Sequence, residues 1–485
     1  MLQQNILNQT QGFIFLFLFW IVAFLCIRMF FKKKETNLTF LVSNRNVGLL
    51  LGAITVSIAW VWAPALFVSS QKAYEQGVPG LFWFTLPNAG ALILFAFLAT
   101  RMRKIFDSGF TLPEYMGKRF NRRMELLYSF TIFIVQAYAV IVNLTAALLL
   151  LNLVTGIQKE SLIVILGLMM VSLSLLKGIR SSFVEDAIKT GMVALVALII
   201  VPWGILATGG LPGVISGIGG VTGKFTNLFD PTIFWTFGIP ISISLLSGIV
   251  IDQQQWQRAF SIKRKDVKTA FLLGGVIFAV VPIMLGALGY LAANPALNLK
   301  ILPQQHQLAG FLVLSKFLPA AAIIGFTAMI LSGLVAAGSS ALSAVSSIGA
   351  TDFYRKIKPK ASDKELLKAS RVSMVMLILI GMGISLIPNI QLLYLVLAVG
   401  AFRAALFIPT VLSLFWNKLS AEYTFWGIIL GMIVGVPLFI YGSITKNPNI
   451  TSFGSLIPII ITLFTCVLGG VTNNRVFKFS SLLKK

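Results

Sequence analysis

The segment SIAWVWAPALFVSS, residues 57–70, has the apolar composition of a helix that crosses a membrane, but it contains a proline near its middle. Pro64 lacks the backbone N–H that a helix interior needs, so we expect the helix to be interrupted there. A second apolar segment, TFGIPISISLLSGIV at residues 236–250, contains Gly238, Pro240 and Gly248. Interrupted backbone is tolerated within a membrane where it lines a cavity, and paired interruptions are typical of carriers with inverted repeats. The two segments therefore predict a solute cavity between them.

The composition of the whole chain indicates a membrane protein. Of its 485 residues, 57% are hydrophobic and 11% are charged, and the mean hydropathy is +0.90. A soluble domain carries about 25% charged residues. Apolar runs of the roughly 20 residues needed to cross a bilayer recur along the sequence. They predict an all-α polytopic fold with about 13 transmembrane helices, near residues 12–31, 47–70, 79–100, 126–153, 161–177, 183–208, 232–251, 269–292, 318–348, 369–388, 391–416, 421–442 and 453–473.

The two interrupted helices begin consecutive blocks of five helices, which predicts a 5+5 inverted repeat. We expect an extra N-terminal helix and loop in residues 1–46, the first repeat in 47–208, the second in 209–420, and two extra helices with a tail in 421–485. The alternative is that proline and glycine only kink these helices, as they often do in membranes.

The basic residues predict how the chain is oriented. The net charge is +24, and most of the 39 Lys and Arg residues fall in alternate loops, whereas the loops between contribute single cations. Basic loops remain on the cytoplasmic side. We therefore expect an integral protein of the cell (inner) membrane with its N-terminus outside and its C-terminus in the cytoplasm. The positive charge is expected to contact membrane lipid, not nucleic acid.

Few residues are suited to catalysis or to metal binding. Cys26 and Cys466 both lie in apolar spans, and the one histidine, His306, lies in a loop among glutamines. No pattern of a nucleophile, a base and an orienting group is present, so an enzyme is not expected. No cofactor is expected either, apart from Na⁺ or H⁺ as a coupling ion.

Four short strings resemble the sodium/solute symporter family, which has the leucine-transporter-like fold. They are FTLPEYMGKRFNRRM at 110–124, GIRSSFVED at 178–186, DQQQWQRAFSIKRKD at 252–266 and AVSSIGATDFYRK at 344–356. Their order along a thirteen-helix plan makes the resemblance specific. The strings WVWAPALFVSSQKAYEQGVPG and DQQQWQRA look most like the urea and polyamine branch.

The resemblance implies a sodium site where the second span is interrupted. Aligned with the family, this chain places carbonyl ligands at Ile58, Val61 and Gly333. The positions of two expected hydroxyl ligands are occupied by Ala336 and Ala337, which have no side-chain oxygen. Because sodium requires oxygen ligands, these alanines argue against sodium coupling. The alternative is a shift of register by one turn, which would bring in Ser339 and Ser340.

A charged residue on the sixth span suggests another coupling ion. Lys189 lies one turn after Asp186, on the helix that flanks the sodium position in this architecture. An intramembrane charge must face a polar cavity or a partner. One hypothesis is that the Lys189 ammonium group takes the cation site and makes transport proton-coupled or uncoupled, because a buried lysine can exchange protons. The alternative is that Lys189 pairs with Asp186 or Glu185 and extends toward the interface.

The candidate solute ligands are Trp60 and Trp62 on the second span and Asp252 and Gln253 at the cytoplasmic end of the seventh. Aromatic faces and a carboxylate favour a small neutral amide or a cationic amine. The alternatives are that the tryptophans only anchor the interface and that Asp252 pairs with Arg258. Arg403, an unexpected charge in the eleventh span, would meet a carboxylate solute, Asp186 or lipid phosphate.

These observations predict a secondary active transporter that moves a small polar solute by alternating access. The resemblance implies sodium coupling, and Ala336, Ala337 and Lys189 point to a proton-coupled or uncoupled carrier. A transporter-derived sensor or a passive channel is the alternative function. No kinase or receiver domain follows Lys485 in the sequence, which favours a carrier that acts alone.

Overall fold

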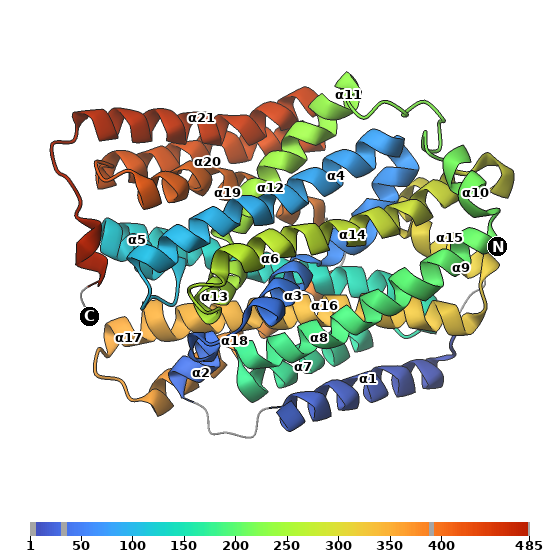
Figure 1. Ribbon diagram of the computed structural model, residues 1–485, viewed down its shortest axis with the longest axis horizontal. Coiled ribbons are helices and arrows are strands. Elements are labelled where there is room, and N and C mark those ends of the chain that lie inside the picture. Colours follow the sequence, from blue (N-terminus) through green and yellow to red (C-terminus); the bar gives the residue numbers. More distant parts are fainter. Residues whose placement is uncertain (1–5, 31–35, 388–391, 484–485) are drawn as a thin grey trace.

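The protein is a bundle of long helices that run side by side (Figure 1). The computed structural model describes residues 6–30, 36–387 and 392–483, and the only bridge between extended residues in that part of the chain joins Val47 to Ile262. The start of the first helix, Gln9–Phe30, and the last described residues, 479–483, lie at opposite ends of the bundle (Figure 1). This arrangement agrees with an odd number of membrane crossings.

Eleven helical stretches of the described chain are long and apolar enough to cross a membrane. They are α1 (Gln9–Phe30), most of α4 (Ala63–Ile105), α6 (Arg122–Thr155), α7 (Lys159–Lys177), α8 (Ile179–Leu195) with η2 (Val196–Ile200) and α9 (Val201–Ala207), α11 (Pro231–Ile233) with η3 (Phe234–Gly238) and α12 (Ile239–Ile251), α14 (Val267–Ala293), α16 (Ala320–Ile348) with η6 (Gly349–Tyr354) and α17 (Arg355–Ile357), α18 (Asp363–Leu386), α20 (Ala421–Ile444) and α21 (Pro448–Thr472). Two further apolar helices, α3 (Leu49–Trp60) and α19 (Leu392–Phe415), bring the described chain close to the predicted number of about thirteen spans.

Shorter helices lie between the long ones or after the last of them. These are α2 (Asn37–Val42), η1 (Ser43–Arg45), α5 (Leu112–Arg119), α10 (Gly210–Ser216), α13 (Gln253–Ser261), η4 (Pro295–Leu297), η5 (Pro303–Leu308), α15 (Ala309–Phe317) and η7 (Phe479–Leu483). The elements α2, α5, α13 and α17 gather at one end of the bundle, and α10 and α15 lie at the other (Figure 1).

Helix α4 contains parts of two spans, because its 43 residues would measure roughly twice the thickness of a bilayer as one straight helix. The chain turns at Gly77, where φ is +58° and ψ is −143°. A Cβ atom there would lie 2.3 Å from the Phe225 carbonyl oxygen and 2.7 Å from that of Ile218. Only glycine fits both this conformation and this contact.

The second span is interrupted where the sequence predicts it. Helix α3 ends at Trp60, the backbone is non-helical at Val61 and Trp62, and α4 begins at Ala63. Pro64 lies in the first turn of α4, where a helix does not need its missing N–H. The proline therefore starts the second half of a broken helix.

The seventh span is not interrupted where the sequence predicts it. It stays helical through Pro240 and Gly248, because the π-helical η3 shifts the hydrogen-bond register just before Pro240. The interruption lies further along, at Asp252, which has φ −82° and ψ 109°. The residues after Asp252 were expected in a basic loop, but they form α13, and its side chains are buried. The hydropathy of the sequence does not indicate this half-helix, because its side chains are polar and face protein, not lipid.

The two interrupted spans lie in the centre of the bundle. Helix α16 packs against α6 and α8, while α14 packs against α3 and α4, and α12 contacts α4 and α19. The pair α20 and α21 covers one face of the bundle, and α1 lies on the opposite face (Figure 1). The non-helical residues of both interruptions are thus enclosed by protein.

Candidate coupling and solute site

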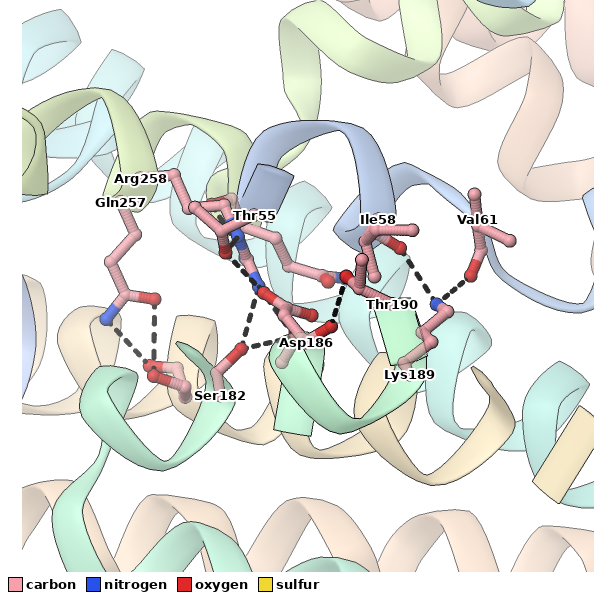
Figure 2. A network of polar contacts seen from close by, with 12 residues as sticks. Thr55, Ile58, Val61, Ser182, Asp186, Lys189, Thr190, Gln257 and Arg258 are labelled. Carbon is pink, nitrogen blue, oxygen red and sulfur yellow. Dashed lines mark hydrogen bonds and ion pairs between the residues drawn. The ribbon is translucent and has the colours of Figure 1, made fainter. Parts of the chain in front are cut away.

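The ammonium group of Lys189 lies against the interruption of the second span. Its Nζ donates hydrogen bonds to the carbonyl oxygens of Ile58, at 2.8 Å, and of Val61, and lies 3.5 Å from the oxygen of Gly333 on α16. Lys189 is 0% exposed. Figure 2 shows the side chain directed at Ile58 and Val61. The interruption provides these acceptors, because Val61 lies outside the helical hydrogen-bond pattern.

The surrounding side chains do not fit a sodium ion. Ala336 and Ala337 offer no oxygen, as the sequence shows, and the serines one turn on are engaged elsewhere. Ser339 Oγ lies 3.3 Å from the Met170 carbonyl oxygen, and Ser340 Oγ lies 2.8 Å from Ser182 Oγ. The described chain thus presents three backbone carbonyls at this position, and all three face the ammonium group of Lys189.

A buried ion pair lies one turn away on the same helix. The Arg258 Nη2 atom on α13 is 2.9 Å from Asp186 Oδ2 on α8, and both side chains are almost completely buried. The same nitrogen donates to Ser182 Oγ at 2.7 Å and to Ser340 Oγ at 3.0 Å. Thr55 on α3 donates its hydroxyl proton to Asp186 and accepts a hydrogen bond from Arg258 Nε at 3.2 Å. Figure 2 shows this network beside Lys189.

The network joins α3 and α13, which are halves of the two interrupted spans, to α8 and α16. The sequence placed Arg258 in a loop, with Asp252 as its alternative partner, and both expectations are wrong. Arg258 is buried because α13 turns back into the bundle. Asp252 instead accepts hydrogen bonds from Gln136 Nε2 and from the Gln254 backbone N–H, each at 3.0 Å.

The two interruptions meet at a small cavity. It has a volume of about 10 Å³ and is lined by Ala59, Trp60, Trp62, Val135, Ala139, Asn143, Gly248, Asp252, Gln254, Ala337 and Arg403. This volume holds about one water molecule. The side chains therefore nearly fill the space in this conformation, and a solute requires some of them to move.

Aromatic rings and two charged groups form the cavity wall. The ring centres of Trp60 and Trp62 are 6.2 Å apart, and Trp62 meets Tyr138 edge-on at 6.0 Å. The Trp60 indole N–H donates to Asn88 Oδ1 at 3.0 Å, which fixes the ring. The Arg403 guanidinium carbon lies 5.8 Å from the Trp62 ring centre and 5.3 Å from that of Tyr138.

The structure brings together three of the four predicted solute residues. Trp60, Trp62 and Asp252 line the cavity, and Gln253 does not. The Gln253 side chain instead donates to the Phe110 carbonyl oxygen and accepts from the Leu112 backbone N–H, both at 3.0 Å, so it holds the loop before α5.

The sequence did not point to Gln254 at the cavity or to Tyr138 against the Trp62 ring. Consecutive residues on a helix are rotated by about 100°, so the run of three glutamines does not indicate which one faces the cavity. Tyr138 lies in α6, in a stretch without a recognisable motif. The sequence does show Arg403 as an intramembrane charge. Asp186, one of the three partners considered for it, forms its ion pair with Arg258 instead.

The sequence of the chain also matches a known protein family. The model of the sodium:solute symporter family matches residues 14–431. The chain belongs to this family. This is a family of membrane transporters and not of enzymes, as the sequence predicts for this chain.

Curated relatives of this symporter include transporters of different solutes. The urea-proton symporter DUR3 of Oryza sativa subsp. japonica is 22% identical over 91% of this chain and 66% of its own length. The urea active transporter of Saccharomyces cerevisiae is 25% identical over 79% of this chain and 56% of its own length. The chain thus spans less than two thirds of both of these relatives. The osmoregulated proline transporter OpuE of Bacillus subtilis is 24% identical, with 95% of each chain covered.

Two solved structures share the fold of this symporter. A Na⁺-coupled sialic acid symporter in a substrate-bound outward-open state superposes with a TM-score of 0.76, at 17% identity and over 96% of this chain and 98% of that one. Mhp1, a nucleobase-cation-symport-1 family transporter in a closed conformation, gives 0.56 at 11% identity, over 93% and 98% of the two chains. Both likenesses support the predicted all-helical transporter fold.

Proposed function

We propose that this symporter couples solute transport to protons through Lys189, in place of sodium. The observation that carries the proposal is the Lys189 Nζ atom, 2.8 Å from the Ile58 carbonyl oxygen and also hydrogen-bonded to that of Val61. A fixed ammonium group at this position supplies the positive charge that a bound cation would supply. Ala336 and Ala337, which replace the two hydroxyls expected from the family resemblance, support the same conclusion.

Protonation of Lys189 would control how the interruption is held. A protonated amine donates charge-assisted hydrogen bonds, which contribute about 1.5–3 kcal/mol each. Loss of the proton removes the charge and weakens the link between the second span and helices α8 and α16. The second span lines the solute cavity, so its freedom to move would depend on the proton. A carrier that takes up the proton on one side and releases it on the other would couple both fluxes.

The solute is proposed to be small and polar. The cavity of about 10 Å³ leaves no space for a large ligand without extensive rearrangement, and its wall combines aromatic rings with charged groups. The names of the relatives include urea and proline, both of which are of suitable size. The rice relative is named a urea-proton symporter, which agrees with the proposed coupling.

Transport into liposomes tests the coupling ion. The purified protein is reconstituted and supplied with urea, amines, amino acids and sugars, while proton and sodium gradients are applied separately. We expect accumulation of a solute with a proton gradient and no further stimulation by sodium. Accumulation driven by sodium alone would overturn the proposal, and flux without any gradient dependence would indicate a channel.

The variant Lys189→Gln tests the proposed residue, because glutamine keeps the hydrogen-bonding ability but carries no proton to exchange. We expect its transport to lose the response to pH. The matched control is Lys265→Gln, which removes an exposed lysine outside the site and should behave like the wild type. A full pH response in Lys189→Gln would overturn the assignment.

A further inference from the structure

Arg403 on α19 is a buried cation that the coupling mechanism does not use. The residue is 7% exposed and lines the cavity between the two interrupted spans. Its Nε atom is buried and has no hydrogen-bond partner in the described part of the chain. A charged residue within a membrane span is costly and is usually functional. Arg403 therefore has hydrogen-bonding capacity at the cavity that the described residues do not use.

The contacts of Arg403 leave its N–H groups available. The guanidinium lies within 6 Å of the ring centres of Trp62 and Tyr138, which stabilise its charge through their electron-rich faces. Ring faces do not satisfy the five N–H donors of a guanidinium. A Cβ atom added to Gly248 would lie 3.5 Å from Arg403 Nη1. Because glycine has no side chain, space remains beside this nitrogen.

A carboxylate lies on the wall of the same cavity. Asp252, at the interruption of the seventh span, uses Oδ1 to accept both of its hydrogen bonds, from Gln136 and from the Gln254 backbone. Among the described residues, no side chain forms an ion pair or a hydrogen bond with Oδ2. The cavity thus presents one positive and one negative group, and neither is fully satisfied by protein.

We propose that the transported solute is a small zwitterion, with its carboxylate bound by Arg403 and its ammonium group facing Asp252 and the aromatic rings. Buried charges are stable when they are paired and hydrogen-bonded. A neutral amide leaves both protein charges without an ionic partner, an amine satisfies only Asp252, and a simple acid satisfies only Arg403. A compact amino acid satisfies both. This inference rests on the proposed transport function, because it names the solute class for the same site.

Binding to the purified protein tests the solute class without any gradient. Isothermal titration calorimetry at one fixed pH compares L-alanine and L-proline with alaninamide, which lacks the carboxylate, with propionate, which lacks the ammonium group, and with urea. We expect the two amino acids to bind about 10- to 100-fold more tightly than the other three, since each lost charge-assisted contact costs about one to two powers of ten. Equal or tighter binding of urea, alaninamide or propionate, or no binding of either amino acid, would overturn the proposal.

Variants then test the residues. Arg403→Gln is expected to weaken L-alanine binding about 10- to 100-fold, Arg403→Lys is expected to weaken it less, and Asp252→Asn is also expected to weaken it. Lys265→Gln is the matched control, with binding as in the wild type. L-alanine binding by Arg403→Gln at wild-type strength would overturn the role of Arg403. The ligand series on the wild type decides the solute class even if a variant fails to fold.

The binding measurement tests the solute class and the transport measurement tests the coupling ion, so one proposal can be refuted while the other stands. Calorimetry at one pH reports which solute binds, whatever ion drives transport. The liposome experiment reports which gradient drives transport, whatever solute is carried. A symporter that binds amino acids but follows a sodium gradient would retain the solute class and lose the proton proposal.

Discussion

Lys189 and Arg258 are both buried cations, but different groups stabilise them. Lys189 Nζ faces neutral backbone carbonyls, including that of Ile58 at 2.8 Å, whereas Arg258 forms an ion pair with Asp186 at 2.9 Å. A lysine surrounded by neutral acceptors can lose its proton without leaving an uncompensated charge, and an arginine stays charged. This difference agrees with the proposed proton cycle at Lys189 and with a permanent structural link at Arg258.

At the residue scale, we predict that Arg258→Gln strongly destabilises the protein. The change leaves Asp186 buried without its ionic partner, which typically costs about 3–5 kcal/mol. The double variant Arg258→Gln with Asp186→Asn should recover part of this loss, because it also removes the unpaired carboxylate. Arg264→Gln, at an exposed arginine in the next loop, is the control. Thermal unfolding in detergent measures the effect, and equal melting of Arg258→Gln and Arg264→Gln would contradict the structural link.

At the scale of elements, the positions where helices stop determine the site. The non-helical residues Val61 and Trp62 end α3, and Asp252 separates α12 from α13. The first interruption provides the carbonyl oxygen of Val61, and the second places Asp252 at the cavity. A continuous helix at either position would use these groups internally, so the interruptions create the site.

Helix α4 allows a direct test of one such backbone position. We predict that Gly77→Ala destabilises the protein, because a Cβ atom would lie 2.3 Å from the Phe225 carbonyl oxygen and the φ of +58° with ψ of −143° is strained for alanine. The cost should exceed about 1 kcal/mol. Gly90→Ala in the same helix is the matched control, since nothing lies within 4 Å of its added Cβ. It should be neutral or stabilising by up to about 1 kcal/mol. Similar melting temperatures of the two variants would contradict the constraint at Gly77.

For the whole molecule, the orientation in the membrane remains a prediction from charge. The elements α2, α5, α13 and α17, which flank the basic loops, gather at one end of the bundle (Figure 1). Retention of such loops on the cytoplasmic side predicts that this end faces the cytoplasm. The end with α10 and α15 would then face outward.

Labelling of single cysteines on intact cells checks this orientation. In a background with Cys26 and Cys466 replaced by serine, cysteine is introduced at Ser362 in a basic loop or at Thr226 in a loop of the opposite end, both exposed positions. A maleimide that does not cross membranes should label Thr226→Cys and leave Ser362→Cys unlabelled until the cells are opened. The reverse pattern would contradict the predicted orientation.

Much of the fold could be predicted from the sequence, because membrane insertion depends on local properties. The lengths of apolar segments predicted thirteen spans, and Pro64 predicted the first interruption, which the structure has at residues 61 and 62. Ordered motifs indicated the family, which the match over residues 14–431 confirms. The predicted boundaries of the two repeats stay a prediction.

The sequence by itself determined the membrane fold, the family and the residue types near the coupling site, including Lys189, Ala336 and Ala337. The tertiary structure decided that Asp252 interrupts the seventh span, that Gln254 and not Gln253 faces the cavity, and that Arg258 pairs with Asp186. The physical reason is that hydropathy depends on short stretches of chain, whereas helix rotation and the point of unwinding depend on packing between distant segments. Arg403 reaches the cavity only because α19 packs against α12.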